Sequence, residues 1–116
     1  MSARVLIVDD HADFRALART LLEAGGLEVV GEAHDGASAL EAARRLKPGV
    51  ILIDVGLPDL DGFELCERLA GDAAVVMTSS RGASTYRGRL AASSARGFIA
   101  KAELTGHALA ALAAPE

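Results

Sequence analysis

Five short apolar runs recur along the chain, and each is followed by a stretch in which apolar residues return at helical spacing. Two of the runs, residues 5–8 and 50–53, contain no polar residue, which is typical of parallel strands covered by helices on both faces. The predicted strands cover residues 4–8, 28–33, 50–53, 74–77 and 97–100. Strands that alternate with helices predict right-handed crossovers and a parallel sheet.

The segments between these strands predict five helices. They cover residues 12–24, about 37–46, a short stretch that follows Gly62 and ends at residue 69, a stretch between residues 84 and 95, and about 103–113. The first helix carries an apolar face made of Phe14, Leu17, Ala18, Leu21 and Leu22. Gly88 lies inside the fourth helix and costs about 1 kcal/mol relative to alanine, so we expect this helix to be the least stable.

Length and composition indicate one soluble domain that spans residues 1–116. Hydrophobic residues make up 51% of the chain and charged residues 24%, but no apolar run is long enough to cross a membrane. The first residues lack the pattern of a secretory signal, which predicts a cytoplasmic location. The net charge of −4 argues against direct binding to nucleic acid, because such binders display an excess of Lys and Arg.

Four of the predicted strands end at residues that carry chemistry. They are Asp9-Asp10 after the first strand, Asp54 after the third, Thr78 after the fourth and Lys101 after the fifth. Because ligands of open parallel sheets bind at the carboxyl ends of the strands, we expect these side chains to meet in one shallow pocket. Each residue alone is more readily explained as a helix cap, a turn residue or a solvated side chain, but their joint placement favours a site.

Three carboxylates, one hydroxyl and one ammonium suit phosphoryl transfer with Mg²⁺. This ion prefers oxygen ligands, and Asp10 and Asp54 are the candidates for direct ligands. Asp54 can also attack a phosphoryl group as a nucleophile, while Lys101 and the Thr78 hydroxyl offset the charge on the transferred oxygens. The sequence therefore predicts a transient acylphosphate on Asp54.

The same residues resemble the signature of the CheY-like receiver domain of bacterial response regulators, over residues 4–113. The acidic pair matches Asp9-Asp10, the phosphorylated aspartate matches Asp54 within residues 53–64, the switch hydroxyl matches Thr78, and the lysine matches Lys101. The resemblance implies an α/β fold: a doubly wound (βα)5 sandwich of three layers whose five parallel strands have the order 2-1-3-4-5.

Further site residues follow from the resemblance alone. It implies that Asp9 joins Asp10 and Asp54 at the Mg²⁺ site, that the backbone carbonyl of Gly56 binds the metal, and that Phe98 forms an aromatic switch with Thr78. The family's lysine is usually followed by proline. Here Ala102 follows it, so we expect a trans peptide bond. The segment from Asp54 to Thr78 is short for the family, which predicts a short third helix.

The resemblance implies a signalling switch rather than an enzyme. A sensor histidine kinase or phosphotransfer protein would donate the phosphoryl group, and the altered surface would bind a downstream partner, an output domain or a second copy as a homodimer. The small residues Gly56 and Ser80 predict slow self-dephosphorylation.

Two alternatives remain: the receiver portion of a longer helix-turn-helix transcriptional regulator, and a pseudo-receiver that binds partners without phosphorylation. Haloacid-dehalogenase-like phosphatases also use an aspartate nucleophile, but they need a second acid where Gly56 stands, which argues against that enzyme class.

Other residues with reactive side chains carry weaker signals. Cys66 is the only cysteine, which excludes an intramolecular disulfide, and packing is its expected role. His11, His34 and His107 lack the spacing of a metal site, although His11 follows the acidic pair and could adjust metal affinity slightly. Ser79, Ser80 and Arg81 predict a solvated polar loop.

Overall fold

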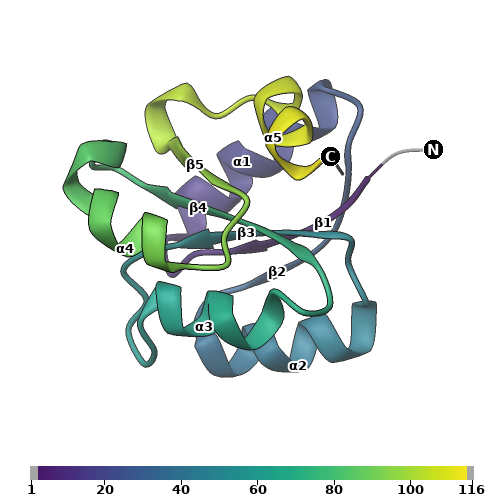
Figure 1. Ribbon diagram of the computed structural model, residues 1–116. Coiled ribbons are helices and arrows are strands. Elements are labelled where there is room, and N and C mark those ends of the chain that lie inside the picture. The colour runs from purple at the N-terminus through teal and green to yellow at the C-terminus, as the bar shows by residue number, and fades with distance from the viewer. Residues whose placement is uncertain (1–2, 115–116) are drawn as a thin grey trace.

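The computed structural model describes residues 3–114 and contains one five-stranded parallel sheet (Figure 1). Its strands are β1 (Arg4–Val8), β2 (Glu28–Ala33), β3 (Val50–Asp54), β4 (Ala74–Ser79) and β5 (Gly97–Ala100). They pair in the order β2-β1-β3-β4-β5, and every pairing is parallel. The predicted strand order and α/β class are confirmed.

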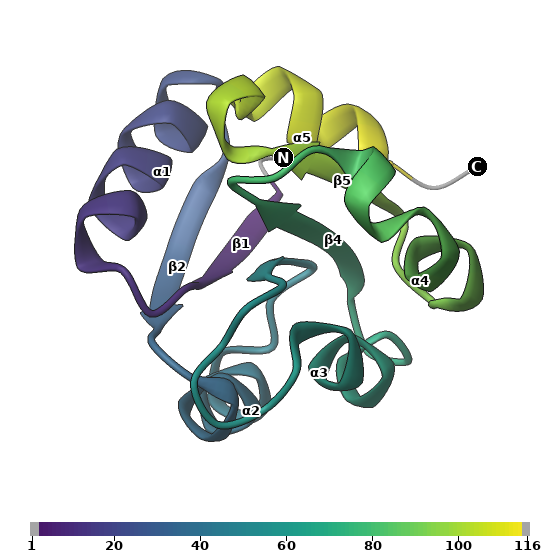
Figure 2. The same cartoon turned by 90° about the vertical axis from the view of Figure 1, so that its left-hand side faces the viewer.

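Helices cover both faces of this sheet (Figure 2). The α-helices are α1 (Ala12–Ala24), α2 (Gly36–Leu46), α3 (Gly62–Leu69), α4 (Arg87–Ala92) and α5 (Gly106–Ala113), and the 3-10 turns are η1 (Ala83–Tyr86) and η2 (Lys101–Glu103). Helices α1 and α5 lie together on one side, whereas α2 and α3 lie on the other. The predicted three-layer sandwich is therefore confirmed.

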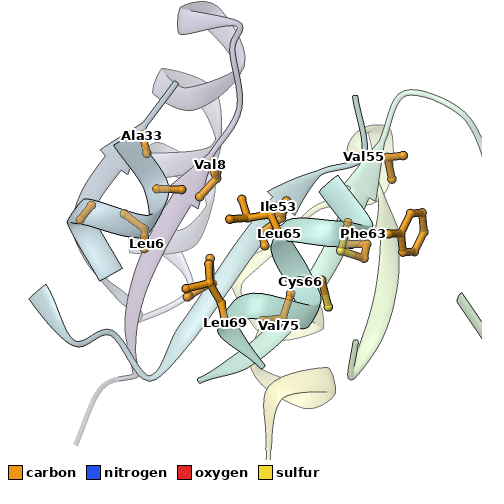
Figure 3. Close-up of a cluster of buried hydrophobic side chains, with 14 residues drawn as sticks. Leu6, Val8, Ala33, Ile53, Val55, Phe63, Leu65, Cys66, Leu69 and Val75 are labelled. Carbon is orange, nitrogen blue, oxygen red and sulfur yellow. The ribbon is translucent and has the colours of Figure 1, made fainter. Parts of the chain in front are cut away.

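Residues 5–8 of β1 and 50–53 of β3 are all apolar because the two helical layers form two separate cores. Leu6 and Val8 of β1 point toward α2 and α3, and Val5 and Ile7 point toward α1 and α5. Figure 3 shows the first of these cores, where Leu65 packs among the strand residues. A strand buried on both faces has no position left for polar alternation, which explains the apolar pattern. Cys66 lies in the same core, which confirms its packing role.

Helix α1 buries a narrower face than its apolar residues suggest. Ala18 and Leu22, four residues apart, are buried, whereas the side chain of Leu17 is 53% exposed. Residues four apart lie one above the other on a helix, and Leu17 is turned about 100° away from Ala18. The prediction that Leu17 belongs to the buried face is wrong.

Capping explains where the later helices begin. The predicted last helix began near residue 103, but that segment is the 3-10 turn η2, and α5 begins at Gly106. Thr105 caps α5 by accepting a hydrogen bond from the Ala108 amide at 3.0 Å, and a capping residue adopts an extended backbone that ends the preceding turn. The predicted start is therefore wrong by about one turn.

Helix α4 agrees with the prediction of a weak fourth helix. It contains six residues, none of them buried, and follows η1. Helix α3 contains eight residues, as expected for the short segment between β3 and β4.

The described residues include no cis peptide bond, so the bond between Lys101 and Ala102 is trans as predicted. Within residues 3–114, no helix has the length and apolar character that crossing a bilayer requires.

Candidate functional site

Carboxylates and a lysine meet at the carboxyl edge of the sheet, as the sequence predicts. Asp9 follows β1, Asp54 is the last residue of β3, and Lys101 follows β5. The Lys101 Nζ atom lies 2.6 Å from Asp9 Oδ2 and 3.4 Å from Asp54 Oδ1. Three segments far apart in the sequence thus bring one ammonium between two carboxylates.

Asp9 is buried, and hydrogen bonds hold both its backbone amide and its backbone carbonyl. Its amide donates to the carbonyl of Ala33 at 3.0 Å, and its carbonyl accepts a hydrogen bond from Arg15 at 2.6 Å. Its Oδ1 atom accepts from the His11 amide at 2.8 Å. The Oδ2 atom has no well-aligned hydrogen bond among the described residues, so the Lys101 ammonium is its electrostatic partner.

Asp10 lies at the open side of the pocket, with one third of its side chain exposed. The Nδ1 atom of His11 lies 3.1 Å from Asp10 Oδ1 and 3.1 Å from Asp9 Oδ1. A ring nitrogen this close to two carboxylate oxygens acts as a donor. The acidic pair therefore combines one buried carboxylate with one that remains accessible to an ion.

Burial raises the pKa of Asp54 above its ordinary value, and the neighbouring Asp9 carboxylate raises this pKa further. The Lys101 ammonium lowers it, but it does not cancel the two larger effects. Asp54 is almost fully buried, so its negative charge is incompletely stabilised in the protein alone. A cation at this position would relieve the repulsion among the carboxylates.

Thr78 lies inside β4, paired with Asp54 in the adjacent strand, and both residues were predicted to follow their strands. The strands extend further because the Val55 amide donates to the Thr78 carbonyl at 3.0 Å, which continues the pairing. The buried Thr78 Oγ1 atom donates to the carbonyl of Ile99 at 2.6 Å. Its hydroxyl is thus engaged with β5.

The structure also places the other two residues that the resemblance implies, Gly56 and Phe98. A methyl group placed on Gly56 would lie 3.8 Å from Asp54 Oδ2, so the backbone of Gly56 passes close to the candidate nucleophile. Phe98 is partly buried on β5, and its ring centroid lies 5.9 Å from that of Tyr86. Gly56 is therefore placed beside the carboxylate, and Phe98 beside the segment that leads into α4.

Sequence reasoning missed several residues that support the pocket. Ser79 is buried rather than solvated, and its hydroxyl lies 3.0 Å from the Tyr86 hydroxyl, so the predicted polar loop is wrong at this position. Arg15 holds the Asp9 carbonyl and also donates to Glu32 at 3.1 Å. A basic residue in the first turn of the helix that follows the acidic pair was the available signal for Arg15. Tyr86 had no local signal, because its partner is set by the fold.

The donor set fits a divalent cation that prefers oxygen. Asp9, Asp10 and Asp54 bring three carboxylates to one edge of the sheet, and within residues 3–114 only the Lys101 ammonium lies among them. Burial raises the pKa of Asp54, and the negative charge of Asp9 raises this pKa further. Mg²⁺ binds through one or two carboxylates and keeps several waters, which suits a pocket with one accessible acid.

The protein-family model of the response regulator receiver domain matches residues 5–113 of the chain. The chain belongs to this family. Response regulator GacA of Pseudomonas viridiflava is 38% identical over 102 residues, which cover 84% of this chain and 48% of GacA. Protein-glutamate methylesterase/protein-glutamine glutaminase 5 of Myxococcus xanthus is 48% identical over 83 residues, which cover 68% of this chain and 24% of that protein.

Solved receiver structures share the same fold. The response regulator of the LuxR family from Aurantimonas superimposes with a TM-score of 0.84 at 29% identity, covering 97% of this receiver chain and 86% of that chain. This receiver chain spans about half the length of the curated regulators that it matches.

The raised pKa of Asp54 predicts how metal-free stability depends on pH. A carboxyl group whose pKa is higher in the folded state favours folding when protonated; this contribution is complete below the ordinary pKa and disappears as pH rises through the raised value. Asp54→Asn resembles the protonated state, so it should raise the urea midpoint at neutral pH and raise it less below about pH 4. Asp72→Asn, at an exposed aspartate, is the matched control. An unchanged or lowered midpoint at neutral pH would contradict the shift.

Proposed function

We propose that this receiver domain, residues 1–116, accepts a phosphoryl group on Asp54 in a Mg²⁺-dependent reaction and thereby switches a binding surface. The observation that carries the proposal is the buried Asp54 carboxylate, 3.4 Å from the Lys101 ammonium and beside the acidic pair. Membership of the receiver family supports the same function. In this function the nucleophile and the charges around it act together.

The chemistry needs a nucleophile, an anchored metal and positive charge. One Asp54 oxygen forms a bond to phosphorus while the bond from phosphorus to the donor's nitrogen or oxygen breaks, and the donor leaves with that electron pair. Bound Mg²⁺ would neutralise charge on the phosphoryl oxygens, and Asp9, Asp10, Asp54 and the Gly56 carbonyl would hold it. Lys101 would leave Asp9 for a phosphoryl oxygen.

The switch begins at Thr78. A phosphoryl oxygen on Asp54 would offer the Thr78 hydroxyl a stronger, charged acceptor than the neutral Ile99 carbonyl that it now contacts at 2.6 Å. Leaving that carbonyl frees space next to β5, into which Phe98 would turn. The surface around α4 and β5 would then change, because Phe98 packs against Tyr86 just before α4.

The partners follow from the role. A sensor histidine kinase or phosphotransfer protein in the cytoplasm would supply the phosphoryl group, and a downstream protein, a linked output domain or a second copy would bind the altered surface. The transcription regulators among the relatives are about twice as long, which supports the receiver portion of a longer helix-turn-helix regulator. This domain itself would not bind nucleic acid or membrane, and it would lose the phosphoryl group slowly by hydrolysis near Gly56 and Ser80.

The proposal is tested by the intact mass of the protein after incubation with acetyl phosphate, with Mg²⁺ or with EDTA. We expect a gain of one phosphoryl group that requires Mg²⁺. Hydroxylamine should remove this group, because it cleaves acylphosphates but not the phosphate esters of serine, threonine or tyrosine. A folded protein that gains no mass with Mg²⁺ would be a pseudo-receiver, and the phosphoacceptor function would be wrong.

A further inference from the structure

We propose that Phe14 is a positioning residue that holds the Lys101 ammonium in the phosphoacceptor pocket. The Lys101 Nζ atom lies 4.3 Å from the centroid of the Phe14 ring, over its face. The same atom lies 2.6 Å from Asp9 Oδ2 and 3.4 Å from Asp54 Oδ1. The ammonium is thus enclosed by two carboxylates and an aromatic face.

The ring is itself held by the core. Phe14 is the third residue of α1, and its partly buried side chain packs against the core between the sheet and helices α1 and α5. Helix α1 begins directly after the acidic pair and His11. The next residue, Arg15, holds the Asp9 carbonyl at 2.6 Å. The first turn of α1 therefore supports both the lysine and its buried carboxylate partner.

Physical chemistry explains why a lysine at this place needs such a support. The ammonium stands on a flexible four-carbon stem, and water competes strongly for it. An aromatic face attracts a cation through the ring quadrupole, and this attraction grows when the cation is shielded from water. Only 16% of the Lys101 side chain is exposed, so the contact operates in a shielded setting. The ring restrains the ammonium without satisfying its hydrogen bonds, which leaves donors for a phosphoryl oxygen.

This role rests on the proposed function only in its consequence. If Lys101 stabilises the transferred phosphoryl group, then a restrained ammonium is already oriented before the donor arrives. The restraint itself exists in the protein without metal, donor or phosphoryl group. It can therefore be measured separately from phosphorylation.

The chain has two lysines, Lys47 and Lys101, which provides an internal standard. Limited acetylation of the full metal-free chain, followed by peptide mass spectrometry, gives the ratio of the two modification rates. Exposed Lys47 should react faster in the wild-type protein. Phe14→Leu keeps an apolar side chain but removes the ring, and it should raise the relative rate at Lys101 about fivefold, which corresponds to the loss of about 1 kcal/mol.

Two further variants separate the ring face from simple packing. Phe14→Tyr keeps the aromatic face and should preserve the wild-type ratio, whereas Leu17→Ala, at an exposed position of the same helix, should leave it unchanged. An unchanged ratio in Phe14→Leu, or an equal rise in Phe14→Tyr, would overturn the proposal. A rise in the modification rate at both lysines would indicate unfolding of the variant. The proton shifts of the wild-type protein then test the proposal.

In the wild-type protein, protons on the Lys101 Cε atom should resonate upfield of those of Lys47, because Cε is bonded to the Nζ atom that lies over the ring face. Equal shifts of the two lysines would overturn the proposal without any variant. Phe14→Leu should also slow phosphorylation by acetyl phosphate about fivefold at saturating Mg²⁺. If the lysine measurements succeed but the wild-type chain accepts no phosphoryl group, the positioning role stands and the phosphoacceptor function fails.

Discussion

Asp54→Asn is expected to reduce Mg²⁺-dependent phosphoryl incorporation to background. The carboxamide occupies nearly the same volume as the carboxylate, but it lacks the negative oxygen that attacks phosphorus. Other carboxylates cannot substitute, because Asp9 is buried against Lys101 and Asp10 lies beside His11. Loss of a nucleophile typically lowers a rate by about a thousandfold or more. Intact mass after incubation with acetyl phosphate measures the effect.

The matched control is Asp59→Asn, in the loop that follows β3. The Asp59 carboxylate accepts hydrogen bonds from the amides of Gly36 at 2.8 Å and Ala37 at 3.1 Å. A residue from another segment of the chain thereby caps α2. Because this carboxylate is hydrogen-bonded at a helix terminus, its loss should leave phosphoryl incorporation intact and lower the free energy of unfolding by about 1 kcal/mol. Continued labelling of Asp54→Asn, or its loss in Asp59→Asn, would refute the assignment of Asp54 as the acceptor.

Gly62→Ala is expected to destabilise the fold by about 1–3 kcal/mol. A methyl group at Gly62 would collide with the Asp54 carbonyl oxygen, and it would lie 2.8 Å from the Val55 Cα atom. These are backbone atoms of the segment that carries the candidate nucleophile, so no side-chain rotation relieves the clash. The Gly62 amide also donates to the Val55 carbonyl at 3.0 Å, which prevents α3 from moving away freely.

Urea unfolding of Gly62→Ala, with Gly71→Ala as the control, measures this prediction. A methyl group at Gly71 meets no atom within 4 Å, and its backbone is not left-handed, so that variant should change stability by less than about 1 kcal/mol. Gly62→Ala should also slow phosphorylation, because the clash displaces Asp54. Equal stability of the two variants would show that the loop after β3 adapts, contrary to the close contact described.

Much of the fold could be predicted because apolar periodicity reports burial directly. The unbroken apolar runs of β1 and β3 identified the central strands, since only strands covered on both faces lack polar positions. Strand ends were less predictable: Asp54 and Thr78 belong to their strands because a hydrogen bond between neighbouring strands extends the ladder. Leu17 was misplaced because an apolar residue on a helix does not specify which side faces the sheet.

The class of fold and the set of reactive groups could be predicted from the amino-acid sequence, since polar residues after predicted parallel strands must share one edge of the sheet. The pairing of these groups could not, because it is set by the packing of the folded chain. Lys101 lies against Asp9 more closely than against Asp54, Thr78 is engaged with Ile99, and Phe14 covers the ammonium. Such contacts depend on packing between segments far apart in the chain. No local pattern encodes them, because each partner is placed by a different strand or helix.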